Sequence, residues 1–385
     1  MIDYIELKQK FIEYYQSEPR CFRAPGRVNL IGEHTDYNGG FVLPIAIDKE
    51  TCVAIAPRND RLIRAYSVNL DQFSEFDLDK NFEFQQGFWL NFVEGVARIL
   101  EQKGFKLTGA NLLIWSDIPS GAGLSSSAAL EIVCAVSLSK LSGYEIDKTL
   151  LAQIGQQTEH DFVGAKVGIM DQFVSANAKK NHALLLDCRS LKFENVLLEL
   201  GDSVFVICNT NVKHDLATSE YNTRRAECEK AVEILQKFLP EITQLRDVTN
   251  EDLQKYQAEL PDVIWRRARH IVSENGRTLE ASKLLREKDL QSFGKLMFES
   301  HFSLKNDFEV SCYELDLLVE IAKNCEGVFG ARMTGGGFGG STINLVKRGN
   351  LPNFIEKITS EYFDKVKFPP TVLVAESNDG ATEIL

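Results

Sequence analysis

Several features that mark membrane, secreted and nucleic-acid-binding proteins are missing from this sequence. No run of about 18 apolar residues exists, so no membrane-spanning helix is expected. The first 15 residues have no basic region followed by an apolar core and do not resemble a signal peptide. Lys and Arg total 43 against 55 Asp and Glu, and the net charge of −12 disfavours nucleic acid or an anionic membrane as a partner. We expect a cytoplasmic protein and a monomer.

The eight cysteines give no sign of a zinc site or a disulfide framework. No two of them form a C-x-x-C pair, and none lies near a histidine at zinc-finger spacing. Cys134 and Cys208 lie within apolar runs, which is typical of small buried side chains in a reducing compartment. The acidic balance still allows a nucleotide ligand, which needs only a local cluster of hydrogen-bond donors.

No internal repeat or Pro-rich linker divides the chain. A length of 385 residues favours two domains, and we place the boundary near residue 195, giving domains 1–195 and 196–385. The order of segments is a mixed α+β pattern rather than a strict alternation, and residues 37–40 predict a hairpin turn. Helices are expected at 2–15, 88–103, 125–141 and 351–363, with a helix-rich stretch at about 220–324. Strands are expected at 21–24, 41–47, 51–56, 62–66, 110–115, 183–187, 204–209, 328–333, 341–346 and 371–375.

Residues 118–129, Ile-Pro-Ser-Gly-Ala-Gly-Leu-Ser-Ser-Ser-Ala-Ala, join a predicted strand to a helix that is apolar nearly all round. Two glycines let the backbone approach a ligand, and the unpaired N–H groups at a helix start favour an anion. The serine hydroxyls add donors, and one of them can reach a metal ion. The alternative is a serine N-cap on a core helix, but a cap needs one serine rather than three. No Gly-Lys-Ser/Thr follows, so this is not a Walker A loop.

A second polar stretch, residues 23–37, lies between two predicted strands. Glu33, His34 and Asp36 are able to accept hydrogen bonds from sugar hydroxyls, and Arg27 is able to stabilise an anion. A polar turn with a structural ion pair explains the same residues equally well. A metal site is conceivable, although the spacing matches no familiar metal motif.

A third segment, residues 334–340, holds five glycines and a formal G-x-G-x-x-G. A dinucleotide-binding fold requires a helix after this motif, whereas strand-like residues follow here. We therefore expect a loop whose backbone approaches a ligand or another loop. Elsewhere, Asp171 stands alone in an apolar stretch, where the pattern favours a helix cap over a functional carboxylate, and Glu159 falls in a predicted helix.

Together these segments resemble the GHMP small-molecule kinase family. Residues 26–37 resemble the signature of its galactokinase branch, residues 121–129 its phosphate loop and residues 335–340 its third glycine-rich motif. Residues 211–225, including Lys213 and His214, are also similar to that branch. The resemblance implies an N-terminal mixed-sheet domain like domain 2 of ribosomal protein S5, a C-terminal ferredoxin-like α+β domain, and an active site between them.

The resemblance also implies roles for single residues. Asp171 corresponds to the catalytic carboxylate, which replaces its interpretation as a cap, and Arg27 corresponds to its cationic partner. Mg²⁺ is expected on Ser127 and Glu159, and Tyr221 is expected to close over the sugar ring. Further sugar contacts are expected from Glu33, His34, Thr35, Asp36 and Asp171, and ATP contacts from Ser67, Gly121, Ala122, Gly123, Leu124, Ser125, Ser126 and Ser127.

The reaction that the resemblance implies transfers the γ-phosphoryl group of ATP to the C1 hydroxyl of galactose. The products are galactose 1-phosphate and ADP, at the first committed step of galactose catabolism. An N-acetylgalactosamine kinase or another sugar-1-kinase stays open, because a sequence does not reveal pocket shape. A non-catalytic galactose and ATP sensor is disfavoured, since such sensors lack the Ser-Ala pair that stands here at Ser127 and Ala128.

Overall fold

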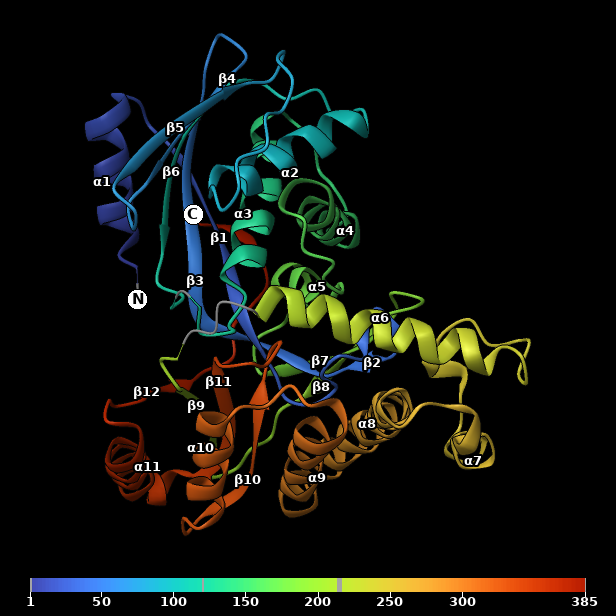
Figure 1. Cartoon of the computed structure of the whole chain (residues 1–385). Helices are drawn as coiled ribbons and strands as arrows, with labels where there is room; N and C mark the ends of the chain where they lie inside the picture. Colours follow the sequence, from blue (N-terminus) through green and yellow to red (C-terminus); the bar gives the residue numbers. More distant parts are fainter. Residues whose placement is uncertain (1, 120, 213–216, 385) are drawn as a thin grey trace.

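The computed structural model describes residues 2–119, 121–212 and 217–384. Two layered parts are stacked one above the other, each built on its own β-sheet (Figure 1). The blue-to-green first half of the chain forms most of the upper part, and the orange-to-red end forms most of the lower part (Figure 1). Within the described ranges, no helix has the length and apolar character needed to cross a membrane.

The upper part contains a mixed six-stranded sheet, as expected. Its neighbouring strands are antiparallel except for β4 and β6, which are parallel. Helix α1 (Tyr4–Tyr15) packs on one face, and the helices that follow β5 cover the other (Figure 1). The strands in sheet order are β13 (Thr382–Ile384), β1 (Arg20–Asn29), β3 (Pro44–Pro57), β6 (Ala110–Ser116), β4 (Leu62–Ser67) and β5 (Gln72–Asp77).

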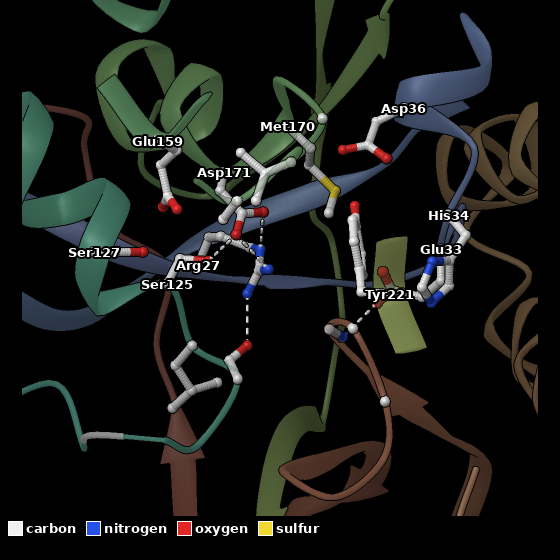
Figure 2. A pocket seen from close by; sticks show the side chains of 18 of the residues that line it. Arg27, Glu33, His34, Asp36, Ser125, Ser127, Glu159, Met170, Asp171 and Tyr221 are labelled. Atoms are coloured by element: carbon white, nitrogen blue, oxygen red, sulfur yellow. Dashed lines mark hydrogen bonds and ion pairs between the residues drawn. The ribbon is translucent and has the colours of Figure 1, made fainter. Parts of the chain in front are cut away.

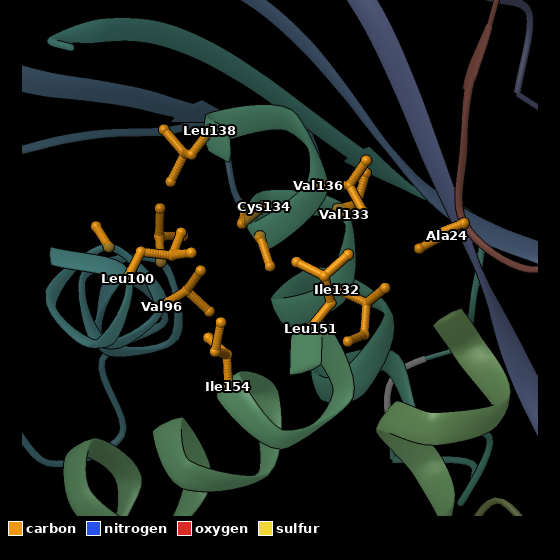
Figure 3. Close-up of a cluster of buried hydrophobic side chains, with 14 of the residues drawn as sticks. Ala24, Val96, Leu100, Ile132, Val133, Cys134, Val136, Leu138, Leu151 and Ile154 are labelled. Carbon is orange, nitrogen blue, oxygen red and sulfur yellow. The ribbon is translucent and has the colours of Figure 1, made fainter. Parts of the chain in front are cut away.

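Helix α3 (Ser126–Leu141) runs through the centre of the upper part. It packs against β1 and β3 on one side and against other helices on the rest of its surface, so its all-round apolar sequence is buried, as such a sequence requires. In Figure 3 its apolar side chains face those of the surrounding helices, and each fully buried aliphatic side chain contributes about 1.5–3 kcal/mol. This packing fixes the start of α3, where the glycine–serine loop ends. The surrounding helices are α2 (Leu90–Gln102), α4 (Lys148–Thr158) and α5 (Met170–Asn177).

The lower part is built on an antiparallel four-stranded sheet. Alternate residues of its strand β9 point to opposite faces: Val206 packs with the helices α10 and α11, and Phe205 packs with α9 and with residues at the end of β1. One apolar cluster therefore joins the two parts below the cavity described next. The strands in order are β10 (Val328–Thr334), β11 (Ser341–Lys347), β9 (Ser203–Asn209) and β12 (Thr371–Ala375), with α8 (Asp262–Glu287), α9 (Leu290–Ser303), α10 (Tyr313–Lys323) and α11 (Leu351–Val366).

Between the two parts lie α6 (Ala217–Leu235) and a small three-stranded sheet (Figure 1). Its strands are β2 (Phe41–Val42), β7 (His182–Asp187) and β8 (Phe193–Leu197), and a short helix α7 (Asn250–Lys255) lies at the outer edge. The boundary near residue 195 stays a prediction. Strand β8 spans that position, and the last strand, β13, returns to pair with β1.

The predicted hairpin turn at residues 37–40 is wrong. Residues Asp36–Asn38 form a single 3₁₀ turn, held by N–H groups of Asn38 and Gly40 that donate to the carbonyl of Thr35. The turn lies inside a longer connection between β1 and β3, whose ends pair at Asn29 and Pro44. The next strand, β2, pairs with β7 far along the chain, a partner that a local turn pattern does not reveal.

Candidate active site

A cavity of about 360 Å³ opens where the two parts of the protein meet (Figure 2). Segments from distant parts of the sequence line it: the end of β1, the 3₁₀ turn, the start of α3, the region around the start of α5, α6 and the glycine-rich loop after β10. The lining residues are Arg27, Glu33, His34, Asp36, Pro119, Gly121, Gly123, Leu124, Ser125, Ser126, Ser127, Glu159, Ala165, Lys166, Val167, Gly168, Met170, Asp171, Tyr221, Asn222, Gly335, Gly336 and Gly337.

The first glycine-rich loop leads from β6 to the start of α3. Gly121 and Gly123 both have φ of +73°, a conformation that glycine adopts without strain. The loop ends at the first turn of α3, whose backbone N–H groups have no partner within the helix and favour negative charge. The loop thus lies at the edge of the cavity, and its role as an anion site stays a prediction.

The second glycine-rich loop lies against the first. A Cβ built on Gly335 would stand 3.1 Å from the carbonyl oxygen of Gly123, so the two backbones approach closely. The loop connects the antiparallel strands β10 and β11, which agrees with the rejection of a dinucleotide-binding motif. Its glycines let one loop pack on another at the cavity wall, which is one of the two uses expected from the sequence.

Asp171 is held by a two-pronged ion pair with Arg27. Nε of Arg27 donates to Oδ1 at 2.8 Å and Nη2 donates to Oδ2 at 2.7 Å, while Nη1 donates to the carbonyl of Gly123 at 2.7 Å. The hydroxyl of Ser125 also donates to Asp171. The Arg27 side chain is 5% exposed and that of Asp171 is 29% exposed. The buried guanidinium of Arg27 therefore orients the carboxylate of Asp171, which stays accessible from the cavity (Figure 2).

Asp171 is not a helix cap. It lies in the first turn of α5, whose N-cap position is Ile169, and the start of this helix has no side-chain cap. The cap interpretation drawn from the local pattern is wrong because the guanidinium of Arg27, 144 positions away in sequence, takes up both carboxylate oxygens. Ser125, the residue before α3, has a left-handed backbone with φ of 61°, a strained conformation for a side-chain-bearing residue at a functional position.

Glu33 is buried under the second glycine-rich loop. Its Oε1 accepts hydrogen bonds from the N–H of Gly335 at 2.8 Å and from the hydroxyl of Thr334 at 3.1 Å, and Nη2 of Arg332 lies 3.5 Å away. Burial raises the pKa of Glu33, and the charges of Arg332 and Arg27 oppose that rise. Glu33 therefore connects the polar segment that follows β1 to the lower part of the protein, with its carboxyl at the cavity wall.

His34 and Tyr221 stand side by side at the same wall, with ring centroids 5.4 Å apart. Nδ1 of His34 lies 2.9 Å from the hydroxyl of Tyr37, and Nε2 is buried without a partner among the described residues. Burial lowers the pKa of His34 well below its usual value, so the ring is neutral. A neutral ring with a free nitrogen at a cavity wall suits a hydroxyl-bearing ligand.

Asp36 and Asp171 both line the cavity, and Met170 lies between them in the view of Figure 2. Burial is the main cause that raises the pKa of Asp36 to about 7, and the negative charge of Asp171 adds to it. The two carboxyls thus differ in character: Asp171 has a fixed cationic partner, whereas Asp36 holds its proton up to neutral pH.

Ser127 and Glu159 face each other beside the start of α3 (Figure 2). Burial raises the pKa of Glu159 to about 7, which the hydroxyl of Ser127 partly offsets by hydrogen bonding to the carboxylate. One hydroxyl and one carboxylate are hard oxygen donors of the kind that Mg²⁺ prefers, and two protein ligands leave room for phosphate oxygens. Among the described residues, no group of three His, Cys, Asp or Glu side chains is placed to hold a metal, so the metal site considered for Glu33, His34 and Asp36 does not form.

Three residues expected at the site do not line the cavity. Thr35 is fully buried, and its hydroxyl lies 2.8 Å from the carbonyl of Gly32 and 2.6 Å from that of Phe41, so it serves the backbone of the turn. Ser67 is buried at the end of β4. Ala122 is buried, and its carbonyl accepts a hydrogen bond from Ser341. Lys213 and His214, which belong to the family-like stretch at residues 211–225 (the fourth motif), lie outside the described residues.

Sequence reasoning missed Lys166, Met170 and Asn222 as cavity residues and did not single out the contact of Gly168 with Asp36. Lys166 stands in an irregular segment with no periodic signal. Asn222 follows Tyr221 on α6 and lies within the fourth motif, so that motif offered a signal for it. Met170 begins α5 and was hidden in an apolar stretch.

Family models match three parts of the chain. The galactokinase galactose-binding signature matches residues 9–57, the N-terminal domain of GHMP kinases matches residues 91–179, and the C-terminal domain of GHMP kinases matches residues 281–365. These segments contain most of the cavity lining.

Curated relatives are similar over nearly the whole chain. A galactokinase of Roseiflexus sp. is 44% identical, and the match covers 100% of this chain and 98% of that relative. A galactokinase of Chloroflexus aggregans is 48% identical, and the match covers 91% of this chain and 90% of that relative. The crystal structure of Lactococcus lactis galactokinase complexed with galactose has a TM-score of 0.96 and 40% identity, covering 99% of this chain and 100% of that chain. The crystal structure of Methanococcus jannaschii mevalonate kinase shares the fold, with a TM-score of 0.66 and 20% identity. The match covers 94% of this chain and 100% of that chain.

Proposed function

Because the chain belongs to the galactokinases of the GHMP kinase family, we propose that its cavity transfers the γ-phosphoryl group of ATP to the C1 hydroxyl of galactose. The chain is a kinase with ATP as a substrate, and galactose 1-phosphate and ADP are its products. The observation that carries this function is the Asp171–Arg27 ion pair, which lies at the start of α3 and opens onto the cavity. The carboxylate of Asp171 thus lies between the proposed sugar-binding side of the cavity and the proposed phosphate-binding loop.

The triphosphate binds at the first glycine-rich loop. Gly121, Gly123 and the serines at the start of α3 offer backbone N–H groups and hydroxyls along one wall of the cavity. Ser127 and Glu159 would hold Mg²⁺, which when bound neutralises charge on the phosphates and keeps the nucleotide in position. The buried Glu159 carboxylate has no ion pair with a cationic side chain among the described residues, which leaves it available for this cation.

Galactose binds on the opposite wall. Glu33 and Asp36 supply carboxyl groups whose pKa values burial raises, and His34 supplies a neutral ring nitrogen, a mixed set that matches hydroxyls able both to donate and to accept. Tyr221 covers this side with its ring. The direct role of Thr35, and the nucleotide contact of Ser67, stay predictions that their positions outside the lining do not support.

Asp171 orients the C1 hydroxyl and receives its proton. The guanidinium of Arg27 donates a hydrogen bond to each oxygen of the carboxylate, so the carboxylate is held in one orientation toward the cavity. Phosphoryl transfer depends more on positioning and on charge stabilisation than on strong base catalysis. The proton therefore moves to Asp171 late, after the bond to phosphorus has begun to form, and Arg27 stabilises the negative charge that develops beside it.

We also infer where the enzyme works and in what form. We place it in the cytoplasm as a monomer, with an N-terminal domain of residues 1–195 and a C-terminal domain of residues 196–385. Its partners are galactose and ATP, without nucleic acid or membrane.

The test is a coupled assay of ADP release with ATP, Mg²⁺ and a panel of galactose, N-acetylgalactosamine and glucose. We expect turnover with galactose. The Asp171→Ala variant should fold and bind ATP with turnover lowered by about a thousandfold or more. Wild-type turnover in that variant would remove Asp171 from the catalytic role, and turnover only with N-acetylgalactosamine would change the substrate.

A further inference from the structure

A buried polar pair, Glu131 and Gln172, lies behind the active site without lining it. Both side chains are 0% exposed, and Nε2 of Gln172 donates to Oε2 of Glu131 at 3.0 Å. Glu131 stands on α3 and Gln172 on α5, so this hydrogen bond joins two helices inside an otherwise apolar core. Buried polar groups of this kind are costly unless every one of their atoms is paired.

The two remaining oxygens of the pair have no partner among the described residues. These are Oε1 of Glu131 and Oε1 of Gln172. An ionised carboxylate and an amide oxygen are both acceptors and cannot pair with each other. One proton on the carboxyl group would satisfy both oxygens, because its hydroxyl would donate to the amide oxygen while the amide N–H donates back. Burial, with the nearby charge of Glu159 adding to it, raises the pKa of Glu131 well above its usual value.

The pair lies at the junction of α3, which carries Ser127, of α5, which carries Asp171, and of α4, which Glu159 directly follows. Glu131 is one helical turn after Ser127 on α3, and Gln172 directly follows Asp171 on α5. Gly155, one turn before Glu159 on α4, packs onto the pair: a Cβ there would stand 2.8 Å from Cγ of Gln172 and 3.3 Å from Oε2 of Glu131. The pair therefore contacts all three helices.

We propose that Glu131 and Gln172 form an uncharged acid–amide pair, closed by two hydrogen bonds, that positions Ser127, Glu159 and Asp171 relative to one another. Two directional bonds add a specific constraint on the rotation of α5 against α3 to the constraint that apolar packing already supplies. Their role is that of positioning residues, because neither touches the cavity. The proposal rests on the proposed function, which assigns the metal and the catalytic carboxylate to those three residues.

Three variants of the pair and one control test it, with kcat, the KM values for galactose and ATP, and the melting temperature measured for each. Glu131→Gln keeps an uncharged pair with two reciprocal hydrogen bonds, and we expect kcat within about threefold of wild type. Gln172→Met removes both bonds, and we expect kcat to fall about tenfold or more while KM for galactose stays within about twofold. The double variant Glu131→Met/Gln172→Met should recover the melting temperature lost in Gln172→Met while kcat stays low.

Ile154→Ala is the matched control. Ile154 is buried in the same helix junction on α4, so this variant loses stability without losing a polar contact. Below its melting temperature we expect a kcat close to that of wild type. A kcat as low as that of Gln172→Met would show that lost packing, rather than the pair, lowers turnover, and a double Met variant with wild-type kcat would likewise overturn the positioning role.

An infrared difference spectrum between wild type and Glu131→Gln tests the proton independently of activity. We expect the carbonyl band of a protonated carboxylic acid in the wild type at about pH 8 and its absence in the variant, because burial keeps the acid neutral far above its usual range. Absence of the band in wild type overturns the uncharged pair. A wild type that shows the band but releases no ADP with galactose contradicts the proposed function instead, so the two failures are distinguishable.

Discussion

Gly168 lies against the carboxyl group of Asp36, so closely that no side chain fits between them. A Cβ on Gly168 would overlap the nearer carboxyl oxygen and would stand 2.7 Å from the farther one, Oδ1. Gly168 stands two positions before α5, so the segment that delivers Asp171 to the cavity also borders the sugar side. The place of Asp36 depends on the missing side chain at residue 168.

The Gly168→Ala variant should therefore bind galactose poorly. The methyl group displaces the carboxyl of Asp36 from its position at the cavity wall, and a misplaced polar contact to a sugar hydroxyl loses about 1–3 kcal/mol. We expect the KM for galactose to rise about tenfold or more, while the KM for ATP changes little because the phosphate loop is untouched. Initial rates with each substrate varied in turn measure both values.

Gly276→Ala is the control for this substitution. Gly276 lies within α8, where a Cβ meets nothing within 4 Å, and alanine is a better helix former by about 0.5–1 kcal/mol. We expect unchanged kinetics and a small gain in melting temperature. Equal galactose KM values in the two alanine variants would contradict the role assigned to the space beside Asp36.

Arg27→Lys should lower turnover although it keeps the positive charge. A lysine ammonium is a point charge that cannot reproduce the two parallel hydrogen bonds to Asp171 and the third to Gly123. The carboxylate then loses its fixed orientation, and we expect kcat to fall about a hundredfold. Arg20→Lys is the matched control, because Arg20 forms the same two-pronged pair with Glu383 at a site far from the cavity. Similar losses in both variants would contradict the prediction.

The sequence predicts those parts of the site that depend on local pattern. Residues 121–127 read as glycines and serines before an apolar helix, and the structure has that loop and that helix at the cavity. The strand predicted after residue 340 argued against a dinucleotide-binding fold, and the structure has strand β11 at that position. Burial of α3 followed from an all-round apolar composition. Each of these properties is set within one or two neighbouring elements.

The rest depends on contacts between distant segments. Asp171 looked like a cap because its partner, Arg27, comes from β1, and only the closed fold brings the two together. Thr35 lies inside the sugar signature, yet the turn directs its hydroxyl to backbone carbonyls rather than to the cavity. Gly168 carries no local signal, since its constraint is the carboxyl of Asp36. A family resemblance supplies such roles, whereas residue pattern alone does not.

Glu33→Gln should destabilise the protein strongly. The Arg332 side chain is 0% exposed, and Glu33 is a close counter-charge, 3.5 Å away. Removing one partner of a buried ion pair leaves the other charge poorly compensated, which costs about 3 kcal/mol or more. Urea unfolding measures the loss. Glu383→Gln, which breaks the exposed pair with Arg20, should cost at most about 1 kcal/mol, and equal losses would contradict the buried pairing.

The raised pKa of Asp36 predicts how stability depends on pH. Its pKa is about 7 in the folded protein against an ordinary value of 3.8, so between these values the folded protein holds a proton that the unfolded chain has released. The stability that this proton contributes is fully present below about pH 4 and is lost as pH rises through about 7.

Asp36→Asn removes that titration because its amide is neutral throughout. Wild type and variant should melt at similar temperatures near pH 4. As pH rises toward 8, the melting temperature of the variant should increase relative to that of wild type. Thermal unfolding across this range measures the difference, and the galactose KM of the variant should rise because a carboxyl is lost from the cavity wall. A melting difference that stays constant with pH would mean that Asp36 ionises in the folded protein as readily as in the unfolded chain.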